Sequence, residues 1–130
     1  MILLDTHIWY WWINLEHERF SAALKAAITT EDRITVASVS CYEIAFAAER
    51  GRLTLPIPAE EWFREALDNS GIELLPLTPA IASRAVKLNQ IHRDPFDRII
   101  IATALEESAT LASLDGKFSE YPEIKKLLIL

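Results

Sequence analysis

The chain has 130 residues, a mass of 14.7 kDa and 51% hydrophobic residues, which suits one folded domain and excludes an intrinsically disordered chain. Its 13 Lys and Arg against 19 Asp and Glu give a net charge of −6. Such a chain repels nucleic acid, so a nucleic-acid ligand is excluded unless a cation or a basic partner offsets the repulsion. The single cysteine, Cys41, excludes an intrachain disulfide and a cysteine-based zinc site. The start of the chain does not resemble a signal peptide, and no apolar run reaches the roughly 20 residues that span a membrane, so we expect a cytoplasmic location.

Short apolar runs alternate with helical spacing through the first half of the chain. In the expected helices the apolar side chains recur every three or four residues, a spacing that places them on one face. Gly51 follows the third of these helices, where glycine commonly ends a helix. The predicted elements are, in order, a strand at 2–4, helices at 8–15 and 17–28, a strand at 34–37 and a helix at 40–50.

The second half continues the same alternation. Thr78 with Pro79, and Asp94 with Pro95, each form a helix cap followed by the residue favoured at the first helical position. The predicted elements are a helix at 59–69, a strand at 72–75, a helix from 79, a helix at 95–108, and strands at 111–114 and 127–130. The alternation predicts a single α/β domain over residues 1–130, with a central, mainly parallel sheet and helices on both faces.

Four carboxylates stand apart from the other acidic residues because they adjoin long uncharged runs. They are Asp5, Glu43, Asp97 and Asp115. Asp5 and Asp115 follow predicted strands, whereas Glu43 and Asp97 fall in the first turns of predicted helices. Parallel strands end at one edge of a sheet, and ligands bind beyond that edge. We therefore expect the four carboxylates to converge there.

Such a cluster is costly without a cation. Two carboxylates 4 Å apart repel by about 4 kcal/mol at an effective dielectric constant near 20. Four of them either take raised pKa values or bind a metal ion, and an all-oxygen ligand set suits Mg²⁺ or Mn²⁺. Such an ion generates hydroxide from water and neutralises a phosphate, so an acidic pocket can accept a nucleic-acid backbone.

Each residue of this set also has an ordinary structural interpretation. Asp5 can cap the helix that follows it, Asp97 can complement a helix dipole, and Asp115 before glycine is typical of a turn. Glu43 can be a partly exposed helix residue. The neighbours are equally ambiguous: Thr6 and Ser113 can bind a water on a metal or act as caps, and Arg98 can hold a phosphate or serve a structural role.

In their order along the chain, the four acids and the residues around them resemble the PIN domain, and more closely the VapC-type toxins of bacterial and archaeal toxin–antitoxin modules. The start Leu4-Asp5-Thr6-His7 and the segment Asp94-Pro95-Phe96-Asp97-Arg98 carry most of the resemblance, which extends over essentially the whole chain. It implies a parallel sheet and an Mg²⁺- or Mn²⁺-dependent endoribonuclease. The resemblance implies that the acidic site residues of the family correspond to Asp5, Glu43, Asp97 and, at a more variable position, Asp115. The family's hydroxyl residue two positions before the last acid corresponds to Ser113.

The resemblance also implies partners. It implies an RNA substrate, often tRNA or ribosomal RNA, a small cognate antitoxin that neutralises the enzyme, and a homodimer. The dense cluster of Ile8, Trp9, Trp11 and Trp12 fits a surface that a partner covers, because such side chains anchor interfaces. Burial in the core is the alternative interpretation of the same cluster.

Two other classes of function remain open. A phosphatase of the haloacid-dehalogenase type or a response-regulator receiver also places an Asp after the first strand. The phosphatase normally has a second Asp where this chain has His7, and the receiver needs an Asp where this chain has Pro76. A non-catalytic binding module would use the acids only as caps and turns, and stabilisation by a metal ion would distinguish it from a nuclease.

Overall fold

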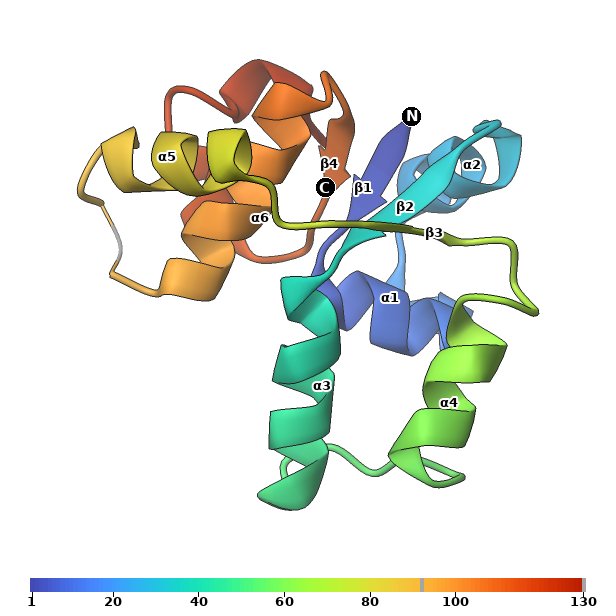
Figure 1. Cartoon of the computed structure of the whole chain (residues 1–130). Coiled ribbons are helices and arrows are strands. Elements are labelled where there is room, and N and C mark those ends of the chain that lie inside the picture. Colours follow the sequence, from blue (N-terminus) through green and yellow to red (C-terminus); the bar gives the residue numbers. More distant parts are fainter. Residues whose placement is uncertain (92, 130) are drawn as a thin grey trace.

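The structure is a computed structural model and describes residues 1–91 and 93–129. Within these residues a parallel sheet of five strands has the order β3-β2-β1-β4-β5 (Figure 1). The strands are β1 (Ile2–Leu4), β2 (Ile34–Ala37), β3 (Glu73–Leu75), β4 (Thr110–Ala112) and β5 (Leu128–Ile129). The predicted α/β fold with a parallel sheet is confirmed. His92 and Leu130, the last residue of a predicted strand, lie outside the described residues.

The connections between strands are helical. The α-helices are α1 (Thr6–Ile13), α2 (Ala22–Thr30), α3 (Val39–Glu49), α4 (Ala59–Ala66), α5 (Pro79–Lys87) and α6 (Pro95–Glu106). Short 3-10 turns are η1 (His17–Arg19), η2 (Gly116–Glu120) and η3 (Lys125–Leu127). Among the described residues, none of these helices has both the length and the apolar character needed to cross a membrane.

Side-chain caps set the helix boundaries and explain where the predictions were wrong. The Asp5 carboxylate accepts from the backbone N–H of Ile8 at 2.9 Å, so α1 begins two residues earlier than expected. The predicted helix at 17–28 is divided in two, because the Ser21 hydroxyl caps a new helix at the N–H of Leu24. The predicted helix at 59–69 ends at Ala66, where the Ser70 hydroxyl donates to the Ala66 carbonyl at 2.7 Å.

Alternate residues of β1 face two separate helical layers. Ile2 and Leu4 pack in a cluster with side chains of α1, α2, α3 and α4, whereas Leu3 on the other face packs with side chains of α6. In Figure 1, α5 and α6 accordingly lie on one side of the sheet and α2 lies on the other. The prediction of helices on both faces is confirmed.

The aromatic residues of α1 divide into buried and partly exposed members. Ile8 and Trp9 are fully buried, and the Trp9 indole N–H donates to the Ala66 carbonyl at 3.2 Å, with its ring edge against Trp62. The prediction that Ile8 and Trp9 belong to a partner surface was therefore wrong, because α4 already covers this face of α1. Trp11 and Trp12 are only partly buried, so the partner surface stays a prediction for these two alone.

Candidate active site

The carboxyl ends of β1, β2 and β4 meet at one edge of the sheet. Leu4 pairs in register with Val36 on one side and with Ala112 on the other, so all three strands end side by side. β1 is also the point where the strand order reverses, because β2 and β3 lie to one side of it and β4 and β5 to the other. Ligands of open α/β sheets bind at such a switch point.

A pocket of about 150 Å³ opens at this edge, and all four predicted carboxylates line it. Asp5 follows β1, Glu43 lies in the second turn of α3, Asp97 in the first turn of α6, and Asp115 follows β4. The expected convergence is therefore present. Within residues 1–91 and 93–129, however, no three Asp, Glu, His or Cys side chains already lie as close together as metal ligands do.

Asp5 has the capping role considered for it and also lines the acidic pocket. It is 5% exposed, one carboxylate oxygen caps α1, and the other accepts a hydrogen bond from the Ser113 hydroxyl at 2.5 Å. The same Ser113 oxygen accepts from the backbone N–H of Asp115 at 3.0 Å, so one buried serine joins two acids of the pocket. Burial raises the pKa of Asp5 to about 6, and the hydrogen bond from Ser113 opposes that rise.

Glu43 is held by a chain of hydroxyl groups. The Thr6 hydroxyl donates to Glu43 Oε1 at 2.7 Å and lies 2.8 Å from the Ser40 hydroxyl. Because Thr6 has one hydroxyl proton, Ser40 donates to Thr6. Burial and, to a smaller extent, the negative charges of Asp97, Asp94 and Asp5 raise the pKa of Glu43 to about 7, against the opposing hydrogen bond from Thr6. Ser40 was not identified from the sequence.

Asp97 meets a cation that the sequence analysis did not assign. The ammonium group of Lys117 lies 2.6 Å from Asp97 Oδ2 and 3.3 Å from Asp115 Oδ2. Burial raises the pKa of Asp97, and the contact with Lys117 opposes it. Burial lowers the pKa of Lys117, but the two carboxylates outweigh it and raise that pKa overall. One signal was available, because Lys117 is the only Lys or Arg between Arg98 and Lys125.

Of the two roles considered for Arg98, the structure shows the structural one. Its side chain is buried, and its guanidinium group donates to the carbonyls of Leu88 and Asn89, each at 2.8 Å. A third carbonyl, that of Val86, lies 3.3 Å away. Arg98 therefore ties α6 to the C-terminal end of α5 and the residues that follow it, and it does not line the acidic pocket.

An aromatic groove adjoins the acidic pocket. We use this name for the cavity of about 380 Å³ that Tyr42, Phe46, Phe96 and Arg52 line, and that shares Thr6, His7, Glu43 and Asp94 with the acidic pocket. The ring centroid of Tyr42 lies 5.9 Å from that of Phe46 and 5.4 Å from that of Phe96. Tyr42 is 57% exposed and Phe46 40% exposed, so both rings are partly accessible to solvent beside the carboxylates.

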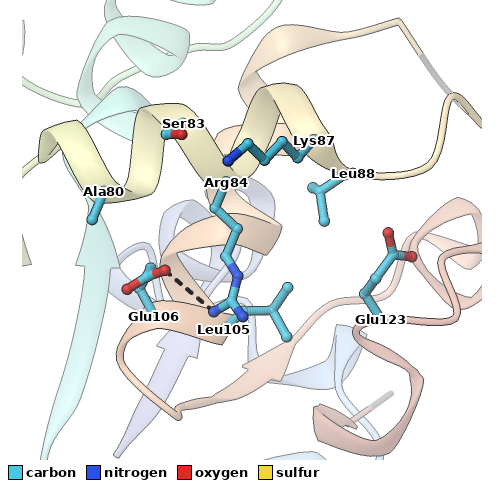
Figure 2. A pocket seen from close by; sticks show the side chains of 8 residues that line it. All are labelled: Ala80, Ser83, Arg84, Lys87, Leu88, Leu105, Glu106 and Glu123. Atoms are coloured by element: carbon cyan, nitrogen blue, oxygen red, sulfur yellow. Dashed lines mark ion pairs between the residues drawn. The ribbon is translucent and has the colours of Figure 1, made fainter.

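A larger pocket of about 500 Å³ lies elsewhere, between α5, the end of α6 and the C-terminal segment (Figure 2). Arg84 and Glu106 form an ion pair across it at 3.3 Å, and the Glu123 carboxylate accepts from the backbone N–H of Asn89. Glu106 is nine residues after Asp97 in the same helix, about 14 Å along its axis. We call it the distal pocket.

The oxygen ligands of the acidic pocket suit a divalent cation. Asp5 and Glu43 are carboxylates whose pKa values are raised chiefly by burial, which disfavours their charged form unless a cation binds. Carboxylate oxygens are the ligands that Mg²⁺ and Mn²⁺ prefer. The residues that can hold such an ion are Asp5, Glu43, Asp97 and Asp115.

Comparison with known proteins agrees with this geometry. The PIN domain model matches residues 2–124. "Ribonuclease VapC22" of Mycobacterium tuberculosis (strain ATCC 25618 / H37Rv) is 36% identical over 121 residues, which are 92% of this chain and 91% of that protein.

Solved structures agree in fold at lower identity. A VapBC2 complex from Rickettsia felis bound to a promoter DNA fragment has a TM-score of 0.70 at 20% identity, over 99% of this chain and 98% of that one. A toxin-antitoxin complex from Klebsiella pneumoniae has a TM-score of 0.65 at 21% identity, over 100% of this chain and 97% of that one. From the match over residues 2–124 and the identity to VapC22, we conclude that the chain belongs to the PIN domain family.

Proposed function

We propose that this protein is a metal-dependent endoribonuclease that hydrolyses RNA phosphodiester bonds. The observation that carries the proposal is the convergence of four carboxylates on one pocket at the switch point of the sheet. The name of the relative, Ribonuclease VapC22, supports the same activity. The sheet order argues against a receiver domain, because receivers have the strand order 2-1-3-4-5 and this sheet does not.

In the proposed enzyme Asp5, Glu43 and Asp97 hold a Mg²⁺ or Mn²⁺ ion directly or through water, and Asp115 assists them. When bound, such an ion lowers the pKa of a water molecule and neutralises charge on the phosphate. Ser113 orients Asp5 through its hydrogen bond, and Thr6 orients Glu43 in the same way. Partners that orient ligands in this manner commonly change metal affinity or activity by 10- to 100-fold.

The aromatic groove supports RNA as the substrate. Exposed rings beside a phosphate-accepting site are typical of proteins that stack splayed bases. Tyr42 and Phe46 supply such rings, and Arg52 supplies a positive charge in the same groove. Together with a bound cation, this charge offsets the net charge of −6 where the RNA backbone would lie.

We infer two protein partners, a cognate antitoxin and a second copy of the chain. The structural neighbours are described as toxin-antitoxin and VapBC complexes, which supports an antitoxin. A further cavity of about 270 Å³ is lined by Asp5, Asp115, His7, Leu114 and the partly exposed Trp11. A protein that covers Trp11 can therefore reach the acidic pocket with a basic side chain.

The test is cleavage of RNA by purified, antitoxin-free protein with added Mn²⁺, Mg²⁺ or EDTA. We expect cleavage with Mn²⁺ or Mg²⁺, none with EDTA, and none from the Asp97→Asn variant. Equal cleavage by the variant and the parent would contradict the proposed site. A protein that neither cuts RNA nor gains thermal stability from Mn²⁺ would instead be a binding module.

A further inference from the structure

We propose that Lys117 is an internal counter-ion of the acidic pocket, which holds Asp97 in the metal-free protein and releases it when a divalent cation binds. The inference rests on the proposed metal site and adds to it the residue that sets the metal affinity. It concerns Lys117 and the two acids that it contacts, Asp97 and Asp115.

Lys117 is in close contact with the Asp97 carboxylate. Lys117 Nζ lies 2.6 Å from Asp97 Oδ2, and no hydrogen-bond donor of the described residues otherwise satisfies this buried oxygen. The Asp97 side chain is 10% exposed, whereas the Asp115 side chain, 3.3 Å from the same ammonium group, is about half exposed. The stronger of the two ion pairs is thus the one with Asp97.

The backbone around Lys117 builds this position. Asp115 caps the short η2 turn, and its Oδ1 accepts from the Lys117 N–H at 3.1 Å. The next residue, Phe118, is buried in the core cluster on the α6 face of the sheet and anchors the turn. The lysine stem is flexible, so its ammonium group can leave Asp97 without moving this backbone.

A divalent cation and the ammonium group compete for the same oxygen. Metal ligands of this kind lie about 2.0–2.6 Å from the ion, so an ion on Asp97 Oδ2 would sit next to a second positive charge. The Lys117–Asp97 contact therefore lengthens or breaks on metal binding. It follows that Lys117 stabilises the metal-free protein and at the same time weakens its affinity for the metal.

The test is titration of Mn²⁺ alone by isothermal calorimetry, without RNA, in parallel with the melting temperature of each protein. The variant Lys117→Met removes the charge, and Lys117→Gln does so while keeping a hydrogen-bond donor. Lys117→Arg keeps the charge. Lys126→Met is the matched control, because Lys126 is an exposed lysine in η3 whose loss changes the net charge equally.

We expect both neutral variants to bind Mn²⁺ at least about threefold more tightly than the parent, with a lower metal-free Tm and a larger rise of Tm with Mn²⁺. Lys117→Arg and Lys126→Met should resemble the parent. If the neutral variants bind Mn²⁺ with the parent's affinity or more weakly, the inference is wrong and the proposed metal site stands. If neither the parent nor the neutral variants bind Mn²⁺, the proposed metal site itself is wrong.

Discussion

The acidic pocket and the distal pocket stand at opposite ends of α6 and differ in how their charges are compensated. The distal pocket is more than three times as large, but Arg84 and Glu106 form an ion pair there and are each more than a third exposed. The acidic pocket is lined by five carboxylates, of Asp5, Glu43, Asp94, Asp97 and Asp115, and by one lysine that contacts two of them; Asp5 and Asp97 are buried there. Water screens the Arg84–Glu106 pair, whereas buried carboxylates of like sign need a cation.

The excess of buried carboxylates, rather than cavity volume, therefore singles out the acidic pocket as the candidate site. Free energy that a fold loses by burying like charges is recovered when a ligand of opposite charge binds. The following predictions test this difference by changing matched residues at the two ends of α6.

The largest effect is expected for Asp97→Asn. Loss of one charged ligand should lower RNA cleavage by on the order of 100-fold or more, with the fold retained. Initial cleavage rates measured with excess Mn²⁺ check this. The control is Glu106→Gln, the same chemical change in the last turn of the same helix, which should cleave at the parent rate. A comparable loss of RNA cleavage in both variants would contradict the proposed difference between the two pockets.

The acidic pocket should also make stability depend on pH. The pKa values of Asp5 and Glu43 in the folded protein, about 6 and about 7, exceed their ordinary values of 3.8 and 4.5. Their protonation favours folding, so this stabilisation is complete below about pH 4 and is lost as the pH rises through 6 and 7.

In EDTA we therefore expect the Tm of the protein to be several degrees lower at pH 7.5 than at pH 5, roughly the effect of a few kcal/mol in a domain of this size. Mn²⁺ should reduce the difference, because a bound cation favours the charged carboxylates. Thermal melts at both pH values, with EDTA and with Mn²⁺, check this. Glu106→Gln should leave the profile unchanged, and a higher Tm at pH 7.5 in EDTA would contradict the prediction.

A smaller effect is expected for Ser113→Ala. The variant loses the hydrogen bond that orients Asp5 but keeps every carboxylate, so cleavage should fall by about 10-fold. Ser83→Ala removes a hydroxyl group from the distal pocket and is the matched control. RNA cleavage rates of both variants with excess Mn²⁺ check this. Cleavage by Ser113→Ala at the parent rate would mean that Asp5 does not need the hydrogen bond from Ser113.

The smallest effect is expected for Arg84→Met. It breaks the ion pair with Glu106, which is largely exposed, so the free energy of unfolding should change by less than about 1 kcal/mol. Urea denaturation measures that change, and RNA cleavage should be unaffected. A large loss of cleavage would show that the distal pocket contributes to function.

Local signals in the sequence predicted much of the fold and of the candidate site. Asp94 with Pro95 and Thr78 with Pro79 begin helices as expected, because a cap acts on backbone groups only two or three residues away. The convergence of the four acids was also predictable, since three short runs end at one edge of a parallel sheet. Each of these inferences depends on neighbours in the chain and on one general rule of topology.

The sequence by itself determined the parallel α/β fold and which carboxylates meet, because caps, periodicity and strand ends are short-range properties. Only the tertiary structure decided that Trp9 is buried under α4, that Arg98 donates to the Leu88 carbonyl just after α5, and that Lys117 lies against Asp97. These contacts join residues that are 57, 10 and 20 positions apart. A tryptophan, an arginine or a lysine has the same local pattern whether it faces solvent or a distant element, so packing alone assigns its role.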